Sequence, residues 1–196
     1  MDRSIELFAK TTPMFYARGN HETRGSFAHQ FLNYFPTPTG ETYYTFRCGP
    51  VFFVMLDAGE DKPDNDIEYF GMADYDRFRR KQVEWLKKVV ESPEFKEAPY
   101  RIAIIHLPTV EVTNHAGVEV RELFAPILNK AGIDVMLGGH THRHLYVPAG
   151  ERECDYPVLI NKAEEALDVD VDMQKIRIQV RDPQQKVVKT LEFPRK

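Results

Sequence analysis

IDVMLGGHTHRH, residues 133–144, is the stretch of this sequence that decides the fold. Its first five residues form a largely apolar run, as a buried strand does, and Gly138 and Gly139 then let the backbone turn sharply. If the chain stays extended, His140 and His142 lie on the same side, so two imidazoles can converge on a cation. A histidine-rich surface loop is the other interpretation, and this stretch alone leaves both open.

Composition favours one domain without a general polyanion-binding surface. The 196 residues are 42% hydrophobic, enough for one core, and 26 Lys and Arg stand against 30 Asp and Glu, a net charge of −4. The two cysteines lack metal-motif spacing. We recognise no membrane-spanning run and no signal peptide, and the sequence leaves the compartment open.

Three predicted strands end in side chains that bind metals or move protons. Residues 14–17 lead into Asn20 and His21, residues 101–105 into His106, and residues 133–137 into His140. In layered α/β folds, ligands gather where several strands end at their carboxyl side. We therefore expect one shared metal site, and imidazole nitrogen with amide oxygen suits Zn, Mn or Fe better than Ca.

The remaining pattern is that of a scaffold. Residues 43–48 and 51–56 predict a β-hairpin, and residues 75–91 predict a helix with one apolar stripe. A helix over residues 120–130 contains Pro126, so we expect it to begin near Leu123 or to kink. With the strand that follows, it suggests an α/β crossover unit. Strands are also expected at 157–160, 175–180 and 186–191, the last two as a hairpin with one solvated face. The polar loop 109–117 contains His115, a candidate for a pocket rim.

Gly19-Asn20-His21-Glu22, His106 and Gly139-His140-Thr141-His142 occur in the order of a known signature. The chain resembles the calcineurin-like metallophosphoesterase family, which includes the purple acid phosphatases. That signature is Asp-x-His, Gly-Asp-x-x-Asp (or -Tyr), Gly-Asn-His-Asp/Glu, a later His and Gly-His-x-His. The resemblance covers residues 12–161, and Glu22 leans toward the purple acid phosphatase branch.

The resemblance implies a layered α/β/β/α sandwich and metal-dependent hydrolysis of phosphoesters. It implies that one metal binds Asn20, His106 and His140, and that His142 helps to bind a second. His21 would lie near the phosphate and protonate the leaving oxygen. Two ions (Mn, Fe or Zn) would clamp the phosphate and activate water. Arg18, Arg24 and His115 are candidates for contacts with the substrate.

The first two motifs of the signature are missing from residues 1–18. We therefore expect residues 1–196 to be a single truncated domain without its N-terminal strands, with a core at 12–161 and C-terminal strands and a hairpin at 157–193. One hypothesis is a dinuclear hydrolase whose second-metal ligands and general acid lie here. The alternative is a non-catalytic fragment that binds at most one metal and self-associates through exposed sheet edges. The substrate (monoester or diester), the metals, the oligomeric state and the compartment, secreted or periplasmic included, stay open.

Overall fold

A six-stranded mixed sheet organises the computed structural model, which describes residues 5–196. The strand order is β1-β2-β3-β4-β6-β5, with β2, β3, β4 and β6 parallel and both edge strands antiparallel to their neighbours. Their bounds are Tyr44–Cys48 (β1), Val51–Leu56 (β2), Tyr100–Ile105 (β3), Val135–Gly138 (β4), Leu145–Val147 (β5) and Val158–Ile160 (β6). The predicted hairpin and the buried strand before His140 are thereby confirmed.

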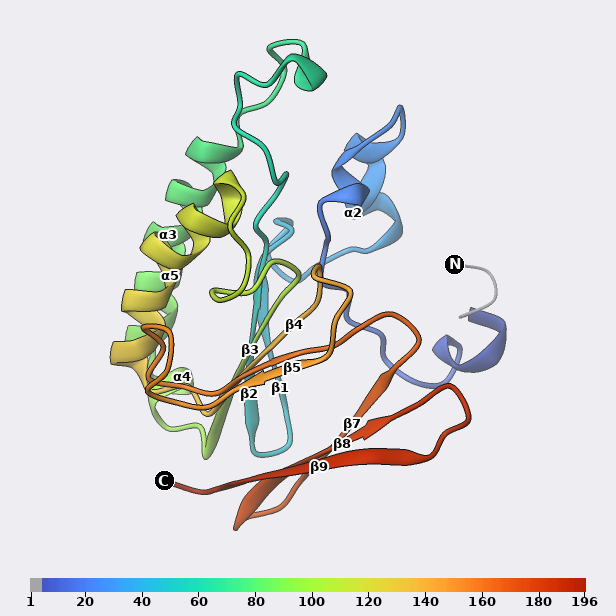
Figure 1. Ribbon diagram of the computed structural model, residues 1–196, viewed down its shortest axis with the longest axis vertical. Coiled ribbons are helices and arrows are strands. Elements are labelled where there is room, and N and C mark those ends of the chain that lie inside the picture. The colour runs from blue at the N-terminus through green and yellow to red at the C-terminus, as the bar shows by residue number, and fades with distance from the viewer. Residues whose placement is uncertain (1–4) are drawn as a thin grey trace.

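Two long helices, α3 (Tyr75–Glu91) and α5 (His115–Ala131), cover one face of this sheet, with the short α4 (Pro93–Lys96) beside them (Figure 1). Their buried side chains, among them Leu86 and Phe124, share one core cluster with strand residues such as Val54. α5 begins well before the predicted residue 120, because the side chain of Asn114 caps its first turn by accepting a hydrogen bond from the amide of Gly117 (2.9 Å).

The other face of the sheet packs against a small antiparallel sheet of β7 (Ala166–Val171), β8 (Lys175–Arg181) and β9 (Val187–Pro194) (Figure 1). Alternate residues of β8, such as Ile176 and Ile178, are buried against Ile102 and Val135 of the large sheet. The described residues thus form layers of helices, large sheet and small sheet. The predicted layered α/β class is confirmed.

The predicted strand at residues 14–17 is wrong. This segment belongs to no strand, although it lies against the edge strand β1. The ring of Phe15 stacks on Phe46 at 3.7 Å between centroids, and the hydroxyl of Tyr44 donates to the carbonyl of Tyr16 (3.1 Å). The apolar side chains thus make ring contacts, with no backbone ladder to β1.

Short helical segments occupy much of the remaining chain. They are η1 (Ile5–Ala9), η2 (His21–Thr23), η3 (Ala28–Gln30), α2 (Phe31–Tyr34) and η4 (Ile67–Tyr69). None of the helices within residues 5–196 combines the length and apolarity needed to cross a membrane.

Candidate metal centre

The carboxyl ends of β3 and β4 bring His106 and His140 together. The two strands are parallel neighbours, and the amide of Gly139 donates to the carbonyl of His106 (3.1 Å). The imidazole centroids lie 5.3 Å apart with nearly perpendicular planes (84°). Beyond Gly139 the chain is not extended, because His140 and His142 have φ of 64° and 56°. The prediction that His140 and His142 lie on the same side assumed an extended chain, and the chain is not extended here.

Asn20 adds a buried oxygen to this edge of the sheet. Its side chain is 1% exposed, and its carbonyl oxygen Oδ1 has no hydrogen-bond partner. The preceding Gly19 packs so closely on His106 that a Cβ there would lie 3.2 Å from the ring. A buried acceptor without a donor is costly, and a bound cation would remove that cost.

Burial and neighbouring charges keep the two imidazoles neutral. Burial and, to a smaller extent, His140 lower the pKa of His106 to about 4, against an opposing effect of Glu22. Burial also lowers the pKa of His140, with His142 acting in the same direction. Neutral imidazoles offer lone pairs to a metal ion at neutral pH, and Nε2 of His140 lies 3.4 Å from the side-chain amide nitrogen of Asn114. Two such nitrogens and an orphaned amide oxygen therefore suit a Zn, Mn or Fe ion.

His21 and His142 are both exposed, whereas Asn20 is buried and His106 and His140 are half-buried. Each contributes to lowering the pKa of His106 and of His140, so each lies within electrostatic reach of the two. His21 begins η2, directly after Asn20. Exposure leaves both imidazoles accessible to a substrate or a second ion.

The three candidates for substrate contact are all engaged with carboxylates. Arg18 Nε lies 2.7 Å from a carboxylate oxygen of the buried Asp57, and Arg24 Nε lies 2.5 Å from Glu60 Oε1. His115 Nε2 lies 2.8 Å from a carboxylate of α3. Their role toward a substrate stays a prediction.

Sequence reasoning missed two polar side chains at the same edge of the sheet. His144 Nδ1 lies 3.2 Å from Glu165 Oε2, while its Nε2 is buried without a partner. Asn161 follows β6, the neighbour of β4, and its Oδ1 is also buried without a partner. Asn161 directly follows an apolar strand in the sequence, and this position could have identified it as a candidate site residue.

A second group of possible ligand atoms lies between α3 and α5. Atoms of Asp76, His115 and Glu119 all lie within 4.8 Å of one another. The fully buried guanidinium of Arg79 already pairs with Asp76 (2.5 Å) and Glu119 (2.6 Å). This cluster is a salt-bridge network that already holds its own cation.

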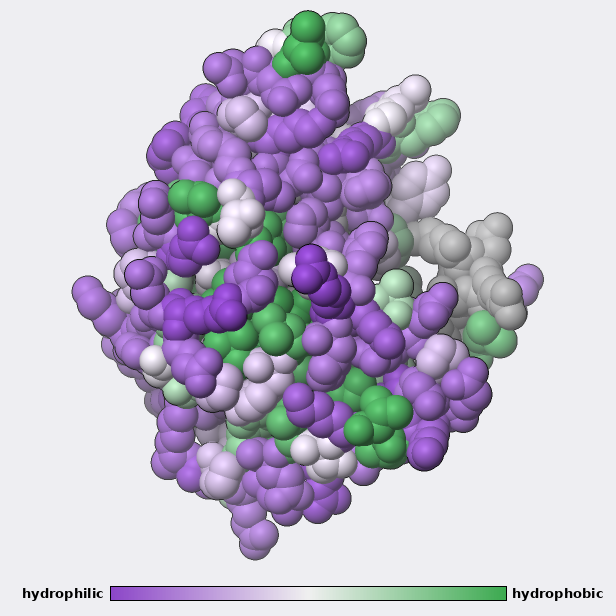
Figure 2. Space-filling view, viewed as in Figure 1, coloured by the Kyte–Doolittle hydropathy of each residue, from purple (hydrophilic) through white to green (hydrophobic). Residues whose placement is uncertain are grey.

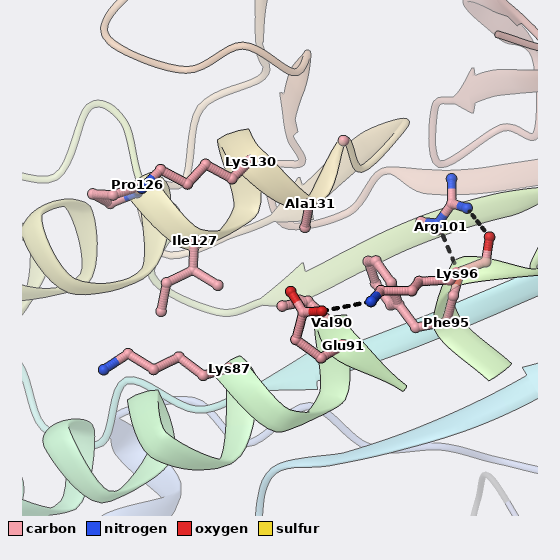
Figure 3. Close-up of a pocket in the computed structure, with 11 residues that line it drawn as sticks. Lys87, Val90, Glu91, Phe95, Lys96, Arg101, Pro126, Ile127, Lys130 and Ala131 are labelled. Atoms are coloured by element: carbon pink, nitrogen blue, oxygen red, sulfur yellow. Dashed lines mark hydrogen bonds and ion pairs between the residues drawn. The ribbon is translucent and has the colours of Figure 1, made fainter. Parts of the chain in front are cut away.

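A groove of about 580 Å³ lies where α3, α4 and α5 approach the amino end of β3 (Figure 3). Lys96 is 2.5 Å from Glu91, and the guanidinium of Arg101 donates to the backbone carbonyls of Phe95 (2.9 Å) and Lys96 (2.6 Å). These contacts, dashed in Figure 3, pair Lys96 with Glu91 and give the Arg101 guanidinium neutral carbonyl partners, while Lys87 and Lys130 also line the groove. His106 lies beyond the opposite end of β3, so the groove is separate from the metal centre.

Comparison with known proteins gives consistent matches. The family described as calcineurin-like phosphoesterase matches residues 2–144. The chain is 25% identical over 154 residues to purple acid phosphatase 18 of Arabidopsis thaliana, a match covering 71% of this chain and 32% of that protein. It is 22% identical over 151 residues to the serine/threonine-protein phosphatase CPPED1 of Mus musculus, covering 74% and 46%.

Solved structures share the fold. Purple acid phosphatase PPD1 from yellow lupin (Lupinus luteus) seeds superposes with a TM-score of 0.60 at 13% identity, over 86% of this chain and 35% of that one. GAP50 of Plasmodium gives 0.58 at 13% identity, over 82% and 56%. The chain spans about a third of the length of purple acid phosphatase 18 and about half of that of CPPED1.

Proposed function

This chain belongs to the calcineurin-like phosphoesterase family, and we propose that it supplies the ligands of one metal ion and a proton donor to a dinuclear phosphoester hydrolase. The observation that carries the proposal is the orphaned side-chain oxygen of Asn20, which follows the glycine packed on His106, whose ring in turn contacts that of His140. Within the described residues, no group donates a hydrogen bond to that oxygen.

Asn20, His106 and His140 would hold the first ion. The lowered pKa values of both histidines mean that few protons compete with the metal at neutral pH. His142 would bind the second ion, whose other ligands the Asp-x-His and Gly-Asp-x-x-Asp motifs of the family provide. Those motifs are absent from residues 1–18.

The bound ions would supply Lewis acidity, polarising the phosphoryl oxygens and acidifying a water molecule. His21 contributes the step that belongs to this chain: its exposed side chain, when it carries a proton, would donate that proton to the leaving oxygen. An alkoxide is a poor leaving group, so that proton matters most for alkyl esters. The substrate is a phosphorylated compound, monoester or diester.

The proposed function is tested by replacing His21 in the metal-loaded full protein. His21→Ala should lower kcat for an alkyl phosphate by about 100-fold or more, the usual contribution of a general acid, and much less for 4-nitrophenyl phosphate. The matched control is His29→Ala, an exposed histidine in the nearby η3. Unchanged kcat for the alkyl ester would remove His21 from the proton-donor role.

A second candidate function is non-catalytic self-association. The surface exposes large apolar side chains, and Figure 2 shows apolar surface at the tip of the loop before α3. That loop contains Ile67, Phe70 and Met72, each more than 80% exposed. Chelator-sensitive turnover of an aryl phosphate by the 196-residue chain alone would favour catalysis. Inactive dimers or larger species in light scattering would favour self-association.

A further inference from the structure

We propose that Glu60 is a positioning residue that holds residues 20–24, and with them Asn20 and His21, against the metal centre. This role rests on the proposed function of those two side chains. Glu60 itself touches neither the ligand histidines nor His21 in the contacts that the structure describes.

Both carboxylate oxygens of Glu60 are used. Oε1 lies 2.9 Å from the hydroxyl of Thr23 and 2.5 Å from Arg24 Nε. Oε2 accepts from a terminal nitrogen of Arg24 (2.9 Å), the hydroxyl of Tyr69 (2.9 Å) and the amide of Asp61 (3.1 Å). Glu60 is 2% exposed, so these charge-assisted bonds form away from bulk water.

The bonds from Thr23 and Arg24 fasten the turn that contains His21. The amide of Thr23 donates to the carbonyl of Asn20 (3.3 Å), and the amide of Arg24 to the carbonyl of His21 (3.1 Å). The hydroxyl of Thr23 also lies 2.6 Å from the backbone carbonyl oxygen of Asn20, so its single hydrogen is shared between that backbone oxygen and Glu60. Residues 20–24 belong to no strand, so the bonds of the turn itself and the side-chain bonds to Glu60 hold them.

Glu60 is itself fixed to the helical layer. The buried guanidinium of Arg79 in α3 donates to the carbonyls of Ala58 (2.7 Å) and Glu60 (3.3 Å). Gln82 of α3 exchanges two hydrogen bonds with the backbone of Asp57 (2.6 and 2.9 Å). Glu60 therefore transmits the position of α3 to the turn beside the metal centre.

The charges around Glu60 reach the ligand set. Asp61 raises and Arg24 lowers the pKa of His140, although burial is the largest effect on it. We call Glu60 with Thr23 and Arg24 the clamp. The clamp and the metal centre therefore lie within electrostatic range of each other. Asn20 reaches the site from the clamped turn, whereas His106 and His140 are fixed by strands.

Glu60→Gln tests the role with nearly the same side-chain shape. Glutamine offers one acceptor oxygen where the carboxylate offers two, and its NH₂ faces donors. We expect amide exchange of residues 19–25 to rise by about tenfold or more, with β3 and β4 unchanged. Co²⁺ affinity should fall by about tenfold, because Asn20 is no longer held. The matched control, Glu68→Gln, changes an exposed carboxylate (61%) on the same loop and should change neither quantity.

In the active full protein, Glu60→Gln should lower kcat more for an alkyl than for a 4-nitrophenyl phosphate, as a displaced proton donor predicts. A general structural defect would lower both equally and would overturn the proposal. Unchanged exchange at residues 19–25 would also overturn it. If Glu60→Gln fails to fold, Arg24→Gln removes the exposed side of the clamp and should raise exchange at the same amides. If the wild-type protein binds no Co²⁺, the proposed function is contradicted. The amide exchange of residues 19–25 in Glu60→Gln still tests the positioning role of Glu60 in that case.

Discussion

Replacing Arg79 by methionine should destabilise the protein far more than the same change at its neighbour Arg80. The guanidinium of Arg79 is fully buried, pairs with Asp76 and Glu119, and donates to the carbonyl of Ala58. Methionine fills most of the space but removes the buried donor from two partly buried carboxylates, which keep only His115 and the exposed Arg80, and from the carbonyl of Ala58. Breaking a buried ion pair on one side costs about 3–5 kcal/mol. Total stabilities are about 5–15 kcal/mol, so the loss would be a large fraction.

Arg80→Met is the matched control, because Arg80 contacts the same carboxylate of Glu119 (3.0 Å) from a 61% exposed position. An exposed pair is worth at most about 1 kcal/mol. Urea unfolding at pH 7, followed by circular dichroism and by fluorescence of Trp85, measures both losses. Equal losses, or less than about 1 kcal/mol for Arg79→Met, would refute the view that this network fixes the loop carrying Glu60.

Two further predictions concern the clamp and the packing at His106. Burial opposes ionisation of Glu60, but hydrogen bonds led by Arg24 outweigh it and lower the pKa from 4.5 to about 2. As the pH falls, the unfolded state takes up the proton first, so the stability difference between wild type and Glu60→Gln should decrease by about 3 kcal/mol as the pH is lowered from above 4.5 to below 2 in urea unfolding. Gly19→Ala places a Cβ 2.8 Å from a carboxylate oxygen of Glu22 and 3.2 Å from the ring of His106, whereas at Gly139 the nearest atom of that ring is 3.6 Å away. Co²⁺ titration should show at least about tenfold weaker binding for Gly19→Ala and little change for Gly139→Ala; equal affinities would contradict the packing.

Residue patterns predicted the scaffold where periodicity was strong. The apolar runs of β2, β3 and β4 and the stripe of α3 mark these elements in the sequence, and α3 spans the predicted residues 75–91. β5, with three residues, and β7, half-exposed along its length, gave weaker signals. At residues 14–17 the apolar composition reflects ring contacts, which composition does not distinguish from a strand.

The site was predictable to the extent that parallel strands dictate it. His106 and His140 follow adjacent parallel strands, and their convergence needs only that topology. The partners of Arg18 and Arg24, by contrast, lie 39 and 36 residues away along the chain. Which carboxylate meets which arginine depends on tertiary packing, and a single sequence does not show it. Glu60 therefore looked like an ordinary loop residue.

Metal titration of the 196-residue chain tests the central claim most directly. We predict that the wild type binds one Zn²⁺ or Co²⁺ per chain, measured by calorimetry and by metal analysis after gel filtration. Asn20→Ala and His140→Ala should each weaken that binding by about tenfold or more, while His29→Ala leaves it unchanged. No binding by the folded wild type, or equal binding by all four proteins, would contradict the metal centre described for Asn20, His106 and His140.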